Sequence, residues 1–144
     1  MVDVFTRERR SYVMSRIRSS GNKATELRLM LLFKMLGIRG WRRNYPIFGK
    51  PDFVFPKLKV VVFVDGVFWH GHPTLGHVPK SNRSYWLNKI KRNQRRDRLV
   101  NRTLRQNGWI VVRIWQNEIT TPIATKKLKK VGLPDRRVEK RTVL

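Results

Sequence analysis

The chain of 144 residues has no cysteine, which excludes disulfides and metal sites built from thiolates. Its apolar runs, such as residues 60–64, fall far short of the roughly 18 residues that a membrane span needs. The N-terminal segment also lacks the apolar stretch of a signal peptide. These absences favour an intracellular, cytoplasmic protein that does not contact membranes. The length is close to that of one average domain, and 40% hydrophobic residues are enough to form its core.

Acidic residues are scarce as well. The chain has 9 Asp and Glu against 33 Lys and Arg, a net charge of +24. Such an excess repels itself unless a polyanion neutralises it, and nucleic acid is the usual intracellular polyanion. A membrane-surface protein would place its basic residues opposite one apolar helix face, whereas here they extend from Arg7 to Arg141. Charge therefore predicts nucleic-acid binding, without separating a nuclease from a ribosomal or packaging protein.

Hydrophobic periodicity predicts an α/β fold with a mixed sheet. A first helix should end at Leu36 after a cap at Asn22 or Thr25, and a long basic helix should run from about 84 to 106. The expected strands are 53–55, 59–65 and 109–115, with a loop at 66–80. We divide the chain into a basic arm (1–22), a core (23–119) and a basic tail (120–144) with at most a short helix around 126–131.

Because acids are scarce, their positions are informative. Asp52 opens the first expected strand and Asp65 ends the second. A hairpin of these strands would bring the two carboxylates to one edge of the sheet, where a like-charge pair favours a divalent cation. The alternative is that each acid forms a salt bridge with an arginine, or that Asp65 is a turn residue before Gly66.

Two further acids lie in the expected helices. The side of the long helix that should face the sheet carries Asn93 and Asp97 between apolar residues. These two residues either point towards the Asp52 region, or Asp97 pairs with an arginine of the sheet or within its own helix. Glu26 lies in the first turn of the first helix, where the helix dipole alone explains an acid.

The loop at 66–80 contains all three histidines and two large aromatic residues. By spacing, His70, His72 and His77 can form a zinc site, but we favour His70 alone as a general base or acid near a metal. Phe68 and Trp69 either pack in the core or, in so basic a protein, wedge between DNA bases and stack on them.

Several of these segments together resemble the very-short-patch repair (Vsr) endonucleases. The matching segments are GKPDFVF at 49–55, VFVDGVFWHGH at 62–72, YWLNKIKRNQRRD at 85–97 and GW at 108–109, with MSRIRS at 14–19 and Glu26 nearer the N-terminus. The likeness covers roughly residues 10–118, in order and with few gaps. It implies a restriction-endonuclease-like α/β core, in which helices flank a mixed sheet.

The resemblance also implies residue roles. Asp52 and the carbonyl of Val64 would bind the metal, and Asp65, which stands where the mismatch enzyme has a histidine, matches the second metal-binding acid of the wider nuclease superfamily. His70 would be the general base. Supporting roles in the catalytic site fall to Glu26, Asn93 and Asp97. The residues expected to contact DNA are Met14, Ile17, Lys50, Phe68, Trp69 and Arg95, of which Met14, Phe68 and Trp69 match the wedge beside a mismatch.

The family's structural zinc site is the main departure. Val67, Thr74 and Gln116 stand at three of its ligand positions and only His72 is kept, so we expect no zinc. The expected activity is Mg²⁺-dependent nicking of double-stranded DNA by a monomer, on the 5′ side of the thymine of a T:G mismatch. The alternatives are a Vsr-like homing, phage or restriction-type endonuclease that cuts matched DNA, or a non-catalytic basic nucleic-acid-binding protein.

Overall fold

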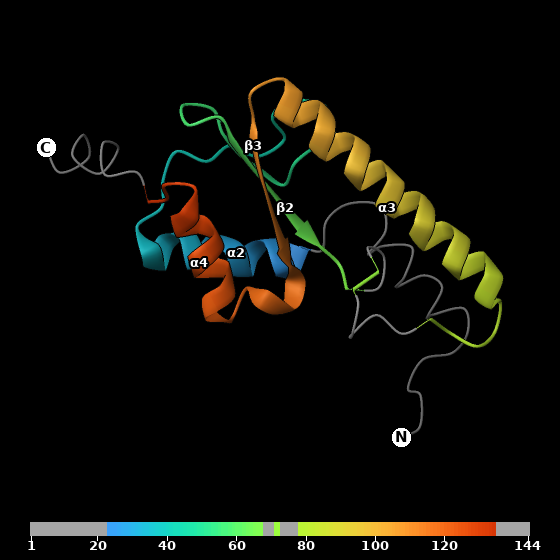
Figure 1. Ribbon diagram of the computed structural model, residues 1–144. Helices are drawn as coiled ribbons and strands as arrows, with labels where there is room; N and C mark the ends of the chain where they lie inside the picture. The colour runs from blue at the N-terminus through green and yellow to red at the C-terminus, as the bar shows by residue number, and fades with distance from the viewer. Residues whose placement is uncertain (1–22, 68–70, 73–77, 135–144) are drawn as a thin grey trace, which may run out of the picture.

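The structure, a computed structural model, describes residues 23–67, 71–72 and 78–134 (Figure 1). Its elements in chain order are α2 (Lys23–Leu36), β1 (Phe53–Phe55), β2 (Val60–Asp65), α3 (Arg83–Gln106), β3 (Ile110–Trp115), the 3₁₀ turn η1 (Gln116–Glu118) and α4 (Pro122–Lys130). The strands and the first two helices lie within two residues of the predicted bounds, apart from the uncertain cap of the first helix.

The three strands form one mixed sheet in the order β1-β2-β3. β1 pairs antiparallel with β2, so that Phe53 lies opposite Val62. β2 pairs parallel with β3, so that Asp65 lies opposite Trp115. Five of the six residues of the central strand β2 are buried, which is what its continuous β-branched and aromatic run predicts. The predicted α/β fold with a mixed sheet is therefore confirmed.

Helices cover both faces of the sheet (Figure 1). Side chains alternate between the faces along each strand. The face under α2 and α4 holds the larger core, formed by Leu29, Phe33, Phe53, Phe55, Val60, Val62, Val112, Ile114, Ala124 and Leu128, among others. The opposite face packs against α3 through Val54, Val61, Phe63, Val100 and Leu104. Asp65 and Arg113 continue this second set, because they follow Phe63 and Val111 by two residues.

The start of the segment expected to be a basic tail belongs to the core instead. Ala124 and Leu128 of α4 are fully buried, and Leu133 is nearly so. The Thr121 hydroxyl accepts a hydrogen bond from the backbone of Ile123 and so caps the helix at Pro122, earlier than the predicted start near 126. The basic residues of this segment obscured its two buried positions, which are enough to dock so short a helix.

The long helix α3 is attached to the sheet mainly through its C-terminal part. Its buried residues are Ile90, Val100 and Leu104, and only the last two belong to the core against the sheet. The N-terminal end of α3, coloured yellow-green, projects away from the strands in Figure 1. None of the helices in the described ranges has the length and apolar character needed to cross a membrane.

Candidate active site

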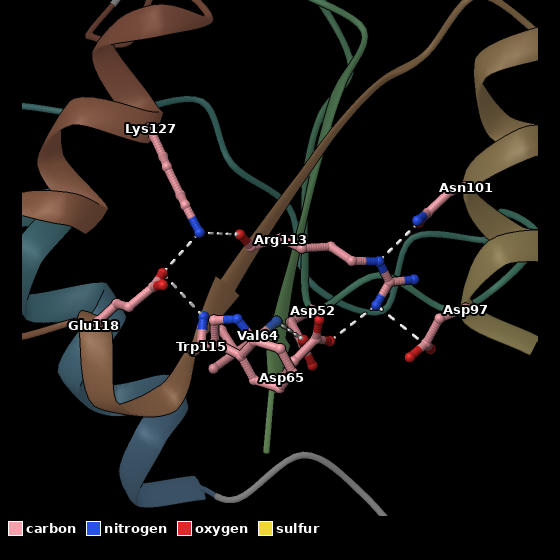
Figure 2. Close-up of polar contacts among 9 residues, drawn as sticks. All are labelled: Asp52, Val64, Asp65, Asp97, Asn101, Arg113, Trp115, Glu118 and Lys127. Carbon is pink, nitrogen blue, oxygen red and sulfur yellow. Dashed lines mark hydrogen bonds and ion pairs between the residues drawn. The ribbon is translucent and has the colours of Figure 1, made fainter. Parts of the chain in front are cut away.

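Asp52 lies directly before β1, at the edge where β1 and β2 meet. Its Oδ2 accepts a hydrogen bond of 2.7 Å from the backbone N–H of Val64 (Figure 2). The N–H and C=O of one strand residue point to the same side of the strand, so the Val64 carbonyl also faces the edge that carries Asp52. A carboxylate and a backbone carbonyl thus lie together at this edge.

Other acids surround Asp52. The pKa of Asp52 is raised from 3.8 to about 6, mainly by burial and to a smaller extent by the negative charges of Glu26 and Asp65, while the Val64 hydrogen bond acts to lower it. Glu26, in the first turn of α2, is buried and forms an ion pair with Arg43. The helix dipole is therefore only part of the reason for an acid at position 26. Three carboxylates share one neighbourhood, although they are far apart in the sequence.

This neighbourhood suits a small divalent cation. The Asp52 carboxylate and the Val64 carbonyl are oxygen donors of the kind that Mg²⁺ prefers, and Mg²⁺ is commonly held by one or two carboxylates while it keeps several waters. Within 23–67, 71–72 and 78–134, no three His, Cys, Asp or Glu residues are grouped to hold a metal. The described donors therefore fit a cation bound through few protein ligands, and not one enclosed by a cage of side chains.

Asp65 forms the salt bridge that was one of its two interpretations, and its role as a metal ligand stays a prediction. Its Oδ1 lies 2.8 Å from the Arg113 guanidinium, which also lies 3.5 Å from Asp97 (Figure 2). The Arg113 Nε donates a 2.7 Å hydrogen bond to the Asn101 side chain, and the guanidinium carbon stands 4.2 Å from the centre of the Phe63 ring. Arg113 therefore links β2 to α3 and partly neutralises both acids.

The other sequence-predicted residues of α3 lie beside this network. Asp97 pairs with the sheet through Arg113, as one of the two interpretations has it. Asn93 lies one turn before Asp97 and is half-buried. Lys50 and Arg95, expected to contact DNA, are exposed.

Two glycines allow the loops on either side of β1 and β2 to pack closely against α3. A Cβ on Gly49, whose φ is +85°, would lie 2.4 Å from a Val100 methyl carbon. A Cβ on Gly71, whose φ is +66°, would lie 2.4 Å from the Gln94 amide nitrogen and 2.8 Å from Ile90. Only glycine fits at these contacts. The segment before Asp52 and the one after residue 70 are thus both held on α3.

Several expected site residues lie outside the described residues: Met14, Ile17, Phe68, Trp69, His70 and His77. Their roles stay predictions. Of the three histidines only His72 is described, and its ring makes an edge contact with Trp115 at 4.7 Å between ring centres. The absence of zinc also remains a prediction.

Two arginines of the site were missed by sequence reasoning. Arg113 is the only charged residue of β3, and a lone charge in an apolar strand that must be buried signals an acidic partner. Arg43, the partner of Glu26, has no such signal, because it is one of many basic residues in a segment without periodicity.

Glu118, to which the sequence assigned no role, fastens the end of β3. Its carboxylate accepts a 3.2 Å hydrogen bond from the backbone of Trp115 and lies 2.7 Å from Lys127 of α4. Lys127 also donates to the Arg113 carbonyl at 3.0 Å (Figure 2). Arg113 is thus held by α4 through its backbone and by α3 through its side chain.

The sequence of this chain is similar to those of known proteins. The family described as DNA mismatch endonuclease Vsr matches residues 2–75. A type II nicking enzyme of Neisseria meningitidis serogroup C is 44% identical over 120 residues, covering 82% of this chain and 80% of its own. A type II nicking enzyme of Xanthomonas oryzae pv. oryzae is 39% identical over 121 residues (83% and 88%). The DNA mismatch endonuclease Vsr of Escherichia coli K12 is 35% identical over 117 residues (81% and 74%).

Proposed function

Because the chain belongs to the Vsr family and is therefore a DNA endonuclease, we propose that it uses Mg²⁺ to nick one strand of duplex DNA at or near a T:G mismatch. The observation that supports a metal at this position is the Asp52 carboxylate, bonded to the Val64 N–H, in an acidic and largely buried neighbourhood. Nicking is supported by the names of the type II nicking enzymes, and mismatch recognition by the name of the Escherichia coli relative.

In this proposal Asp52 and the Val64 carbonyl hold the cation. When bound, Mg²⁺ supplies Lewis-acid polarisation of the phosphate and neutralises the charge that develops on it. The Val64 N–H orients the Asp52 carboxylate, and the Glu26–Arg43 pair limits the negative charge around it. His70 accepts a proton from the attacking water, whose oxygen forms a bond to phosphorus as the P–O bond to the leaving sugar oxygen breaks and that oxygen takes up a proton from solvent.

The proposal is tested by cleavage of a set of duplexes that differ in one base pair. Matched, T:G and other mismatched duplexes, each strand carrying its own label, are incubated with Mg²⁺ or with EDTA. We expect one labelled strand of the T:G duplex to be cut, and only with Mg²⁺. Equal cutting of the matched duplex would replace mismatch recognition by a restriction-type activity, while cutting in EDTA would contradict the metal. The Asp52→Asn variant, purified in parallel, controls for contaminating nucleases.

The raised pKa of Asp52, about 6, predicts an acid limb in the pH–rate profile. The charged carboxylate is the metal ligand, so cleavage should fall as pH drops below about 6 and Asp52 becomes protonated. Protons and Mg²⁺ then compete for the same carboxylate. Raising the Mg²⁺ concentration should therefore move the midpoint of this limb to lower pH, measured as initial rates between pH 5 and 8. A midpoint that stays at the same pH at all Mg²⁺ concentrations would mean that the acid limb comes from a base that does not bind metal.

A further inference from the structure

One side of α3 carries a continuous row of basic side chains. Lys91, Arg95, Arg98, Arg102 and Arg105 follow one another at spacings of four and three residues and are all exposed. On an α-helix such spacing places them along one stripe of about 21 Å. We call these five residues the α3 ridge. It adjoins the stripe that docks on the sheet, so it lies along one flank of the helix.

Acidic side chains of the protein do little to neutralise the positive charge of the ridge. Within the described part of the chain, none of its five residues forms an ion pair, and the only acid of α3, Asp97, is paired with Arg113. Like charges four residues apart destabilise an isolated helix by a few tenths of a kcal/mol per pair. A solvated helix face gains nothing from such a row, so an external anion is the simpler explanation for it.

The surface of the ridge is also hollowed. A shallow hollow of about 430 Å³ is lined by Arg98, Asn101, Arg102, Arg105 and Gln106. Guanidinium and amide groups are among the side-chain groups that proteins use to bind phosphate oxygens. Successive ridge residues stand about 5–6 Å apart at their Cβ atoms, which is close enough to meet neighbouring phosphates of one strand.

We propose that the α3 ridge binds the phosphate backbone of the DNA that flanks the cleavage site. The ridge lies outside the Asp52 neighbourhood, and its contacts are to phosphates, so they add affinity without sequence preference. The inference rests on the DNA endonuclease activity of the family, and it is independent of mismatch recognition and of Mg²⁺. The proposal predicts that a second surface, away from the reacting phosphate, contributes to the affinity for DNA.

The test compares two triple variants with the same change of charge. Arg95→Gln/Arg98→Gln/Arg102→Gln removes the centre of the ridge, and Lys126→Gln/Lys129→Gln/Lys130→Gln removes three exposed lysines of α4, across the sheet. Affinity for a matched 30-base-pair duplex is measured in EDTA over a series of salt concentrations. Each lost phosphate contact should lower the slope of log K against log salt by about 0.9, so we expect a loss of about 2–3 for the ridge variant and under about 1 for the α4 variant.

Equal slopes for the two variants would overturn the proposal, because the effect would then be one of net charge alone. An unchanged slope in the ridge variant would overturn it as well. Thermal unfolding of both variants checks that each is folded. Shortening the duplex gives an independent measurement: the advantage of the wild-type chain over the ridge variant should vanish once the flanking DNA is removed. None of these binding measurements uses a mismatched duplex or a metal. The result can therefore be interpreted even if the T:G proposal fails.

Discussion

Replacing Asp52 by asparagine is expected to lower the rate of strand cleavage by at least about 10³-fold while DNA binding is retained. The substitution keeps an oxygen that can accept the Val64 hydrogen bond, so the local backbone should not change. It removes the charge that a cation requires at this edge of the sheet. Single-turnover cleavage with Mg²⁺ and binding in EDTA measure the two effects separately. Cleavage at the wild-type rate would exclude Asp52 as a metal ligand.

The same variant should be more stable than the wild-type chain in EDTA. The folded-state pKa of Asp52, about 6, lies above its ordinary 3.8, so ionising this group opposes folding. Asparagine carries no charge, and the gain in free energy of unfolding should approach an upper limit of about 3 kcal/mol above pH 7 and fade towards pH 4. Urea unfolding at several pH values measures it. Asp97→Asn is the matched control, because it removes a partner of Arg113 and should not stabilise the chain. A less stable Asp52→Asn chain would contradict this account of the site.

The central fold could be predicted because its signals are local. The apolar runs of β2 and β3 and the length of α3 each fix an element within a short stretch of sequence. The approach of Asp52 and Asp65 followed from the hairpin, because pairing of β1 with β2 determines which residues meet. The same short-range signals failed for α4, where only two buried positions lie among several lysines.

The partners of the acids could not be predicted because they depend on tertiary contacts. Glu26 meets Arg43, and Asp65 meets Arg113, across separations of 17 and 48 residues. In a chain with 33 basic residues, nothing in the sequence selects Arg43 for Glu26, and the lone charge of β3 shows that Arg113 needs an acidic partner but not which one. The choice is made when α3 docks on the sheet and brings Asp97 beside Arg113, which then cannot be separated from either acid at low cost.

Replacing Arg113 by methionine should therefore destabilise the chain strongly. Methionine retains most of the volume over Phe63 but removes the Arg113 charge from beside Asp65, whose side chain is 8% exposed. Breaking a buried pair from one side costs about 3–5 kcal/mol, and the partial exposure of Asp97 places the expected loss near the lower end. Urea unfolding at pH 7.5 measures it. Arg96→Met, the same substitution at an exposed position of α3, should change the stability by less than about 0.5 kcal/mol.

The double variant Asp65→Asn/Arg113→Met separates an uncompensated charge from lost packing. If loss of the positive charge beside the Asp65 carboxylate causes the destabilisation, removing the charge of Asp65 should restore part of the stability that Arg113→Met loses, even though a second residue has been changed. If Arg113 acts only by packing on Phe63 and bonding Asn101, the double variant should be as unstable as Arg113→Met or worse. Restoration would mean that the arginine is retained in β3 because two acids beside the proposed metal site need a fixed positive charge.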